Sequence, residues 1–421
     1  MAGIIKAVKG MHDILPDQSA RWLAFERIFV DLATAYGYKQ IRMPLVEQAE
    51  VFKRTVGEAT DIVEKEMYSF TDRNEDFLCL RPEGTASCVR ACIEHGLLRL
   101  GAQRLWYGGP MFRRERPQAG RYRQFHQFGL ETLGMPGPDI DAELIIFTHR
   151  LWRALGIEGL ALQINSLGTI ESRAGYREQL VAYFESHIEQ LDEDSRRRLS
   201  TNPLRILDSK NPDMQALIDA APMLSEYLDD ESLRDFEELR SILDQAGVSY
   251  RINPRLVRGL DYYQKLVFEW VGGLGAQSTV CAGGRYDGLV EQLGGRATPA
   301  AGFALGVERL LALMAQEETD ADRPHASLIV TDQEMMGIGF QFSERLRDAV
   351  PGIRLMVNCG GGNLKNQFKK ANRSGATVAL VLGQEERQAG EISVKFLREE
   401  REQIRVDQDG LPNFLSQNGI I

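Results

Sequence analysis

Arginines gather in one short stretch of this chain, and their type and spacing suggest phosphate binding. Five fall within eleven residues, interleaved with aromatic side chains: Arg113, Arg114, Arg116, Arg121 and Arg123. A guanidinium group is planar and donates two parallel hydrogen bonds to one phosphate. A nucleoside triphosphate or a nucleic-acid backbone would suit this stretch, although a solvated loop could hold the same charges.

No glycine-rich phosphate cradle accompanies these arginines. The chain has no G-x-x-x-x-G-K-[ST] sequence and no G-x-G-x-x-G after a strand-like run. Gly360–Asn363 precede a predicted helix and could hold an anion at its N-terminus, but that feature alone identifies no ligand. A bound triphosphate would therefore be held by arginines and by the edge of a sheet.

A second group of residues could bind a cationic ligand. Gln127 and Glu131 are four positions apart in a strand-like run, so both would point to one face of a sheet. Together with Glu83 they could form a polar pocket for an ammonium group or an imidazole ring. Exposed carboxylates on a strand are common, so these residues alone do not identify the ligand.

Two further stretches place arginine and tyrosine beside glycines. Arg258, Tyr262 and Tyr263 come just before a strand-like run, and Tyr286 follows a pair of glycines that let the backbone approach a ligand. Neither stretch is a generic motif. They predict guanidinium and aromatic groups near glycine turns.

The elements that must position these residues differ along the chain. Residues 66–135 and 250–313 mix short strand-like runs with glycines, as in a sheet whose polar end faces a ligand. Residues 17–37 have apolar side chains at helical spacing and predict a helix capped by Asp17. The strand-like run Tyr38–Val46 contains Pro44, which predicts an edge strand or a strand end.

A segment of a different kind covers residues 170–248. Its apolar side chains recur at helical spacing, and Ser232 with Asp235 predict a capping box. Residues 171–244 contain nine Lys and Arg against eighteen Asp and Glu, a net charge of −9. We interpret this acidic helical segment as an insertion.

The end of the chain predicts a compact α/β domain. From residue 326 onward, buried-strand runs alternate with helices predicted over residues 338–350 and 364–372. This alternation is typical of a partly parallel sheet.

Composition excludes several classes of protein. The 421 residues are 43% hydrophobic and 26% charged, and no apolar run approaches the roughly 18–20 residues of a membrane span. There is no signal-peptide core at the start, and the five cysteines form no CxxC pair, so we expect a reducing compartment, the cytoplasm. Cys88, Cys92 and His95 are at helical spacing, but without a fourth ligand we predict no metal site.

The net charge of −10 does not exclude an anionic partner. Residues 104–123 contain six arginines and one glutamate, a local charge of +5. A basic surface on an acidic protein can still bind phosphate groups.

At these residues the chain resembles the histidyl-tRNA synthetases, class II aminoacyl-tRNA synthetases, over essentially its whole length. The matching stretches are motif 1 at Tyr38–Glu47, motif 2 at Met111–Glu131 and motif 3 at Gly302–Leu310. The stretches around Arg258 and Tyr286 resemble the two histidine signatures of the family. The tail, with GGGNLKNQFKKANRSG and EISVKFLRE, resembles its anticodon-binding domain.

The resemblance implies a fold and an assembly. Residues 1–325 would form an α+β catalytic core of the class II type, with an antiparallel sheet flanked by helices and interrupted by the helical insertion at 170–248. Residues 326–421 would be a C-terminal α/β anticodon-binding domain. Motif 1 serves dimerisation in the family, so a homodimer is implied.

The resemblance also implies a reaction: ATP-dependent attachment of L-histidine to its tRNA through histidyl-adenylate, with release of AMP and pyrophosphate. Arg113 and Arg258 would be catalytic and would reach the α-phosphate from opposite sides. Glu115 and Arg309 would complete the ATP site, and Mg²⁺ would accompany the β- and γ-phosphates.

The same resemblance assigns residues to the other substrates. The histidine site would comprise Glu83, Gly84, Thr85, Gln127, Glu131, Tyr262, Tyr263 and Tyr286. The tRNA acceptor end would meet Arg116, Gln118, Arg121 and Arg123. Lys365, Lys369 and Arg373, at i, i+4 and i+8 on a predicted helix, would form a basic stripe for the anticodon region, although a solvated helix face has the same pattern.

Two alternatives share the catalytic core of this family. One is the regulatory subunit of ATP phosphoribosyltransferase, which lacks the anticodon-binding tail and catalytic signatures that this chain keeps. The other is an RNA- or amino-acid-sensing module, which would normally be fused to a further domain. Histidine-dependent exchange of pyrophosphate into ATP distinguishes the synthetase from both.

Overall fold

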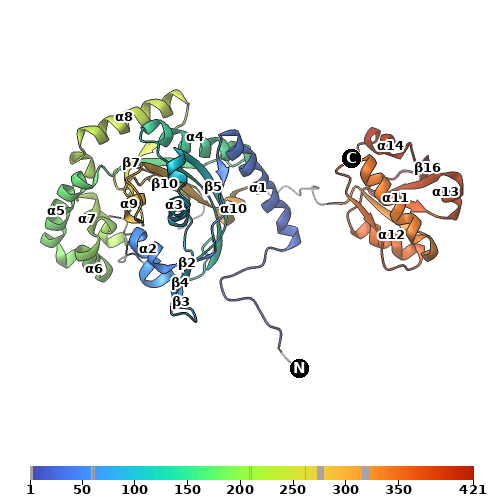
Figure 1. The fold of residues 1–421 in the computed structure, drawn as a ribbon, viewed down its shortest axis with the longest axis horizontal. Helices are drawn as coiled ribbons and strands as arrows, with labels where there is room; N and C mark the ends of the chain where they lie inside the picture. The colour runs from blue at the N-terminus through green and yellow to red at the C-terminus, as the bar shows by residue number, and fades with distance from the viewer. Residues whose placement is uncertain are drawn as a thin grey trace. The chain divides into compact units, whose positions relative to one another are not determined.

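The computed structural model describes residues 3–57, 60, 62–118, 120–207, 209, 211–260, 262–272, 279–314 and 323–421. The chain divides into two compact units, Met1–Gln316 and Glu317–Ile421, which are both drawn in Figure 1. In the ranges just given, no helix has the length and apolar character needed to cross a bilayer.

A sheet of eight strands forms the centre of the first unit. In spatial order its strands are β1 (Lys39–Gln40), β5 (Gln103–Phe112), β6 (Gln124–Leu133), β11 (Ala300–Gly306), β10 (Thr279–Arg285), β9 (Gln264–Val271), β7 (Ala161–Ser166) and β8 (Arg251–Ile252). All inner ladders are antiparallel, whereas β1–β5 and β7–β8 are parallel pairs at the two edges. The expected antiparallel core sheet is therefore confirmed, with a parallel pair at each edge.

Two long helices pack on this sheet through an aromatic core. These are α1 (Pro16–Ala35) and α4 (Pro138–Ala154). Phe29 of α1 contacts Phe147 of α4 and Phe128 of β6, with ring centroids 5.8 and 4.9 Å apart. Burying large aromatic rings of this kind stabilises a helix–sheet interface strongly.

Two local predictions for this unit differ from the structure in detail. The predicted helix over 17–37 exists, but Leu15 is its N-cap and Asp17 lies in the first turn after Pro16, which suits the first helical position. The predicted strand Tyr38–Val46 is split, because Pro44 has no N–H to donate and the chain leaves the large sheet before it. After the break, β2 (Val46–Gln48) pairs with β4 (Phe77–Leu80), which also pairs with β3 (Tyr68–Thr71).

The first unit also contains short helices, which lie along the chain between and after the strands of its two sheets. These are α2 (Ala49–Val56), η1 (Ile62–Glu66), α3 (Thr85–Glu94), η2 (Leu97–Leu100), α9 (Leu289–Gln292) and α10 (Val307–Leu313). Helix α10 follows β11 directly.

The described residues between β7 and β8 form helices. These are α5 (Ile170–Ser186), η3 (Ile188–Gln190), α6 (Glu193–Thr201), η4 (Pro203–Ile206), η5 (Pro212–Met214), α7 (Gln215–Asp219), η6 (Leu224–Glu226) and α8 (Asp230–Gln245). We call residues 170–248 the helical segment. That it is an insertion into the catalytic core stays a prediction.

The predicted capping box at Ser232 is displaced by one turn. The N-cap of α8 is Asp229, whose carboxylate accepts a hydrogen bond from the Ser232 backbone N–H at 2.8 Å. The same carboxylate accepts from the hydroxyl groups of Ser172 at 3.0 Å and Thr169 at 3.2 Å. Asp229 therefore joins the first and last helices of the helical segment, and these hydrogen bonds outweigh burial and lower its pKa.

The second unit has its own five-stranded sheet. In spatial order the strands are β13 (Leu355–Val357), β12 (Ala326–Val330), β14 (Val378–Leu382), β15 (Glu391–Phe396) and β16 (Ile404–Asp407). The first three are parallel and the last two antiparallel to their neighbours. The helices are η9 (Gln333–Met335), α11 (Met336–Ala349), α12 (Leu364–Arg373), α13 (Gln384–Ala389) and α14 (Leu411–Gln417). The predicted partly parallel α/β domain is confirmed.

Candidate active site

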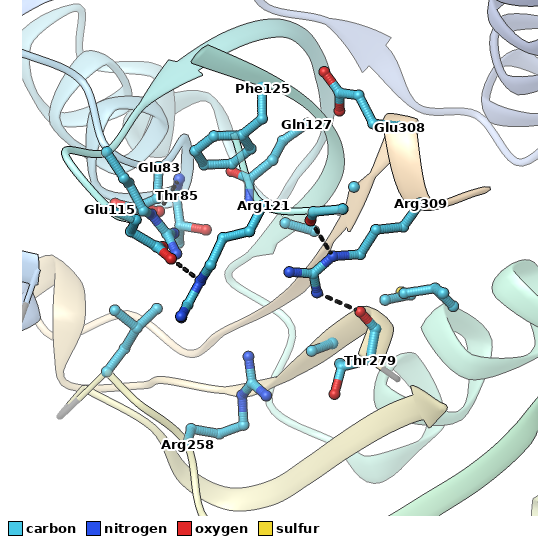
Figure 2. A pocket seen from close by; sticks show the side chains of 18 of the residues that line it. Glu83, Thr85, Glu115, Arg121, Phe125, Gln127, Arg258, Thr279, Glu308 and Arg309 are labelled. Atoms are coloured by element: carbon cyan, nitrogen blue, oxygen red, sulfur yellow. Dashed lines mark hydrogen bonds and ion pairs between the residues drawn. The ribbon is translucent and has the colours of Figure 1, made fainter. Parts of the chain in front are cut away.

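One pocket of the first unit gathers most of the predicted site residues. Its lining includes Glu83, Thr85, Arg113, Glu115, Arg121, Gln127, Arg258, Tyr262, Tyr263 and Arg309. These residues lie far apart in the sequence, but β6, β11, β10 and β9 are consecutive neighbours in the sheet. The sheet order therefore brings the motifs together, and Figure 2 shows Arg121, Arg258 and Arg309 pointing into the pocket from different elements.

Each of the three arginines expected at the triphosphate is held by the protein. Arg113 donates through Nε to the Pro82 carbonyl at 2.9 Å and lies over the Phe125 ring. Arg309 donates to the Gly120 carbonyl at 3.0 Å and to the Thr279 carbonyl at 2.6 Å. Arg258 forms an ion pair with Glu269. Because these bonds fix the side chains, the guanidinium groups are positioned before a ligand binds.

Burial and mutual repulsion make this pocket favourable for an anion. Burial lowers the pKa of Arg113 and of Arg309, and Arg113 adds to the lowering at Arg309. A guanidinium group nevertheless stays protonated in proteins. The pocket thus holds several positive charges away from water, which costs free energy. A bound polyphosphate would offset this cost by pairing with the guanidinium groups.

Glu269 is the residue that the sequence analysis missed. It lies on β9, its Oε1 pairs with Arg258, and its Oε2 accepts from the Thr279 hydroxyl at 2.9 Å. Burial acts to lower the pKa of Arg258, but the Glu269 carboxylate together with Tyr262 and Tyr263 outweighs it, and the pKa is raised. The signal was present in the sequence, because a single carboxylate interrupts the apolar run LVFEWV.

Two buried carboxylates belong to the site, Glu83 in the pocket lining and Glu131 directly behind it. Glu83 accepts from the backbone N–H groups of Thr85 at 2.6 Å and Ala86 at 2.9 Å. Glu131 accepts from the Thr85 hydroxyl at 2.7 Å and from the Tyr286 hydroxyl. Burial raises the pKa of both carboxyl groups, that of Glu131 to about 8. Thr85 thus links the two acids that the sequence placed in one group.

Three tyrosines form one buried aromatic cluster beside these acids. The rings of Tyr262 and Tyr263 are 4.8 Å apart, and Tyr286 lies 5.4 and 5.8 Å from them. Burial raises the pKa of all three, that of Tyr263 to about 12, so the phenols keep their protons near neutral pH. They can therefore donate hydrogen bonds to a bound ring.

Two glycines make room for this arrangement. A Cβ atom on Gly84 would lie 2.2 Å from the Tyr107 ring, and one on Gly302 would lie 2.2 Å from the Tyr286 hydroxyl oxygen and 2.3 Å from a Glu131 carboxylate oxygen. Gly84, Glu131 and Tyr286 are absent from the described pocket lining. Their contacts with Thr85, Tyr107 and Tyr263 place them directly behind it.

The residues expected at the tRNA acceptor end are only partly in the pocket. Arg121 lines it and pairs with Glu115. Gln118 and Arg121 exchange backbone hydrogen bonds in a tight turn. The Arg123 guanidinium donates to the Glu115 and Lys9 carbonyls at 3.2 and 3.4 Å, so it braces the N-terminal segment. Arg116 is outside the described lining as well.

The residues expected near the anticodon are in the second unit. Lys365, Lys369 and Arg373 lie on α12 and are exposed, so their basic stripe faces solvent. The helix N-terminus is capped by the Asn363 side chain, which accepts from the Asn366 N–H at 2.9 Å. The anion site considered at Gly360–Asn363 is thus occupied in part by the chain itself.

No group of three or more His, Cys, Asp or Glu side chains suited to a metal ion is found where the chain is described. The three carboxylates in the described pocket lining are engaged: Glu83 accepts from the Thr85 and Ala86 N–H groups, Glu115 pairs with Arg121, and Glu308 pairs with His126 at 2.9 Å. These carboxylates are therefore better suited to a metal ion that enters already bound to a phosphate ligand than to one bound by protein side chains alone.

Comparisons with known proteins agree with this geometry. The family model "Histidyl-tRNA synthetase" matches residues 10–310, and the model "Anticodon binding domain" matches residues 325–418. The apo histidyl-tRNA synthetase of S. aureus is 35% identical, with a TM-score of 0.82 over 98% of this chain and 99% of that one.

Two more distant structures share the fold. A histidyl-tRNA synthetase from Nostoc sp. PCC 7120 is 19% identical, with a TM-score of 0.71 over 99% of this chain and 100% of that one. A Bacillus halodurans C protein described as an ATP phosphoribosyltransferase regulatory subunit/histidyl-tRNA synthetase is 19% identical, with a TM-score of 0.66 over 91% of this chain and 99% of that one.

Proposed function

Because this chain belongs to the histidyl-tRNA synthetase family, we propose that its pocket forms histidyl-adenylate from L-histidine and ATP and then transfers the histidyl group to tRNA. The chain is a class II histidine–tRNA ligase, which charges tRNA with histidine. The adenylate intermediate, the products AMP and pyrophosphate, and the residue roles below are the proposal.

The observation that carries the proposal is that Arg113, Arg258 and Arg309 line one pocket together with Glu83, Tyr262 and Tyr263. Glu131 and Tyr286 contact this lining through Thr85 and Tyr263, and we call the part formed by these acids and tyrosines the acid–tyrosine end of the pocket. In the first step a histidine carboxylate oxygen attacks the α-phosphorus of ATP. The new bond joins that oxygen to phosphorus, and the bond to the leaving pyrophosphate breaks. Negative charge grows on the phosphate oxygens, so fixed cations lower the barrier.

The arginines divide this work by their positions. Arg113 and Arg258 reach the pocket from different elements and would contact the α-phosphate from two sides. Arg309, with Glu115 nearby, would hold the rest of the nucleotide. Mg²⁺ would enter on the β- and γ-phosphates as the magnesium complex of ATP, where it offsets their charge.

The second step uses the same site. The terminal ribose hydroxyl of the tRNA attacks the carbonyl carbon of the adenylate, an ester bond forms, and AMP leaves with the electron pair of the broken bond. Holding the adenylate between Arg113 and the acid–tyrosine end of the pocket would keep its carbonyl in place for this attack.

Selectivity for histidine follows from the polar groups at that end. Glu83, Thr85 and Gln127 would hold the α-ammonium group. Glu131 and Tyr263 would pair with the imidazole nitrogens, while Tyr262 and Tyr286 enclose the ring and Gly84 leaves room for the Tyr107 ring behind the site. A substrate without two ring nitrogens would leave these buried groups unpaired, which is costly.

The tRNA contacts and the assembly are proposed from the remaining residues. The turn carrying Arg116, Gln118, Arg121 and Arg123 adjoins the pocket and would meet the acceptor end. The α12 stripe would meet the anticodon region. Strand β1 is the edge of the large sheet, and the nearby side chains of Leu45 and Val46 are each 42% exposed, which supports motif 1 as a homodimer interface. The cytoplasm remains our prediction for its location.

The test is exchange of labelled pyrophosphate into ATP. Exchange that requires L-histidine, together with charging of histidine tRNA, supports the proposal. A protein acting only as a regulatory or sensing module on the same fold would bind histidine without exchange, and that result would contradict it.

A further inference from the structure

The helical segment makes close contacts with the loop that carries Arg258. We call residues 255–263, described except for residue 261, the Arg258 loop. The large sheet itself holds this loop through the Asn165 side chain, which donates to the Leu256 carbonyl at 3.0 Å. The remaining contacts described below come from the helical segment, so the loop lies between the sheet and these helices.

The first contact is made by Arg255. Its guanidinium group donates to the carbonyl oxygens of Asp219 at 3.0 Å, Ala221 at 2.6 Å and Pro222 at 2.9 Å. These carbonyls lie at and just beyond the end of α7, where unpaired carbonyls and the helix dipole favour a cation. Arg255 therefore fixes the start of the Arg258 loop to the helical segment.

The second and third contacts fix the end of the loop. Arg173 of α5 donates to the backbone carbonyl of Tyr263 at 2.7 Å. Lys265 lies two residues further along, at the start of β9, and its ammonium group pairs with Glu231 and Asp235 of α8, each at 2.7 Å. Lys265 has a φ of +46°, a conformation that a non-glycine residue keeps only when its surroundings impose it.

Side-chain packing also connects the Arg258 loop to the helical segment. One hydrophobic cluster contains Leu256, Tyr262 and Tyr263 together with core residues of the helical segment such as Tyr176 and Leu217. A Cβ atom on Gly259, next to Arg258, would lie 2.9 Å from the Arg205 guanidinium. The helical segment also belongs to the same compact unit as the sheet.

We propose that the helical segment is part of the adenylation machinery, because it holds the Arg258 loop in the position from which Arg258 and Tyr263 reach the pocket. This inference rests on the proposed function. It makes Arg173 and Arg255 positioning residues that act through Arg258. It also gives the segment a role that its net charge of −9 alone does not suggest, since the contacts use one of its arginines and three of its backbone carbonyls as well as two of its acids.

The alternative is that these contacts only anchor the helices to the unit. A double-mutant cycle separates the two explanations, because residues that act through one group have non-additive effects. The measured quantity is the single-turnover rate constant of histidyl-adenylate formation, with KM for ATP and the melting temperature recorded for each variant. The variants are Arg173→Met, Arg258→Ala and the double variant.

We expect Arg173→Met to lower the rate constant by about tenfold, the loss of one charged hydrogen bond, with little change in KM for ATP. In the Arg258→Ala background the same substitution should have almost no further effect. Arg173→Lys, which keeps a charged donor, should recover part of the rate. Arg240→Met is the matched control, since Arg240 is in α8 and bonds Tyr250 and Glu237, outside the Arg258 loop.

Equal rate losses from Arg173→Met in both backgrounds, no loss at all, or a similar loss in Arg240→Met would overturn the inference. If Arg173→Met unfolds the protein, Lys265→Met replaces it in the double-mutant cycle with Arg258→Ala. Lys265 makes a separate contact, with Glu231 and Asp235, and the expected and contradicting results are the same. Wild-type protein without histidine-dependent exchange would contradict the proposed function and this inference together. Wild-type exchange with additive effects would contradict this inference alone.

Discussion

Replacing Glu269 by glutamine should slow adenylate formation, because it weakens the ion pair that orients Arg258. The two side chains are only 17% and 16% exposed, so water screens their interaction little. A hydrogen bond to a charged group contributes about 1.5–3 kcal/mol, more than an exposed ion pair does. Removing one partner of a buried ion pair destabilises a protein by roughly 3–5 kcal/mol, because the other charge is left unpaired. Glutamine keeps the shape of the side chain and one acceptor oxygen for Arg258, so we do not expect a loss of stability of that size.

If the whole loss falls on the transition state, kcat of pyrophosphate exchange should drop about 10- to 150-fold. KM for ATP should change little, because Arg113 and Arg309 still hold the nucleotide. Glu143→Gln is the matched control, since Glu143 pairs with Arg104 in the same unit but does not line the pocket. An unchanged kcat in Glu269→Gln, or an equal drop in the control, would refute the role given to this ion pair.

Three more outcomes are expected. In the ligand-free protein the raised pKa of Glu131 makes folding stability fall as pH rises from its ordinary value of 4.5 towards about 8, because the native carboxyl keeps a proton that the unfolded chain releases. Glu131→Gln should flatten that slope in thermal melts, and an unchanged slope would contradict the buried protonated acid. Gly302→Ala should destabilise by about 1–3 kcal/mol and raise KM for histidine, since its Cβ would meet Tyr286, whereas wild-type values would contradict the close packing. Charge reversal of Lys365 and Lys369 should raise KM for tRNA and leave pyrophosphate exchange unchanged, and unaltered charging would remove the stripe from the tRNA site.

The sequence predicted those parts of the fold that depend on local pattern. The spacing of apolar residues and the positions of turn residues predicted both ends of α11 and of α12 to within two residues. The same pattern predicted the partly parallel sheet of the second unit. The even spacing of Gln127 and Glu131 placed both correctly on β6. The N-caps of α1 and α8 were predicted less accurately, because Leu15 and Asp229 occupy these positions in place of Asp17 and Ser232.

The convergence of distant residues could not come from spacing alone. Arg113, Arg258 and Arg309 line one pocket because the strands β5, β6, β11, β10 and β9 are consecutive neighbours, which is a property of the sheet and not of any one stretch. The resemblance to a family supplied that arrangement in advance. Glu269 lies in the strand-like run that follows Arg258, but nothing in that run shows which arginine it faces, so its pairing with Arg258 emerged only from the structure.

Long-range contacts to the helical segment were also beyond the sequence. Its charge predicted an acidic surface, yet the groups that touch the Arg258 loop are Arg173, the carbonyls that accept from Arg255, and two acids that pair with Lys265. The net charge of the segment does not show which of its individual groups make these contacts. Only the packing of α5, α7 and α8 against the loop shows which few groups matter.

The most direct test of the account is a crystal structure of the protein with L-histidine and a non-hydrolysable ATP analogue. The account predicts Arg113 and Arg258 on opposite sides of the α-phosphate, Arg309 on the same nucleotide, and the imidazole between Glu131 and Tyr263. A triphosphate bound away from any of these three arginines, or a histidine whose ring points away from Glu131, would contradict it.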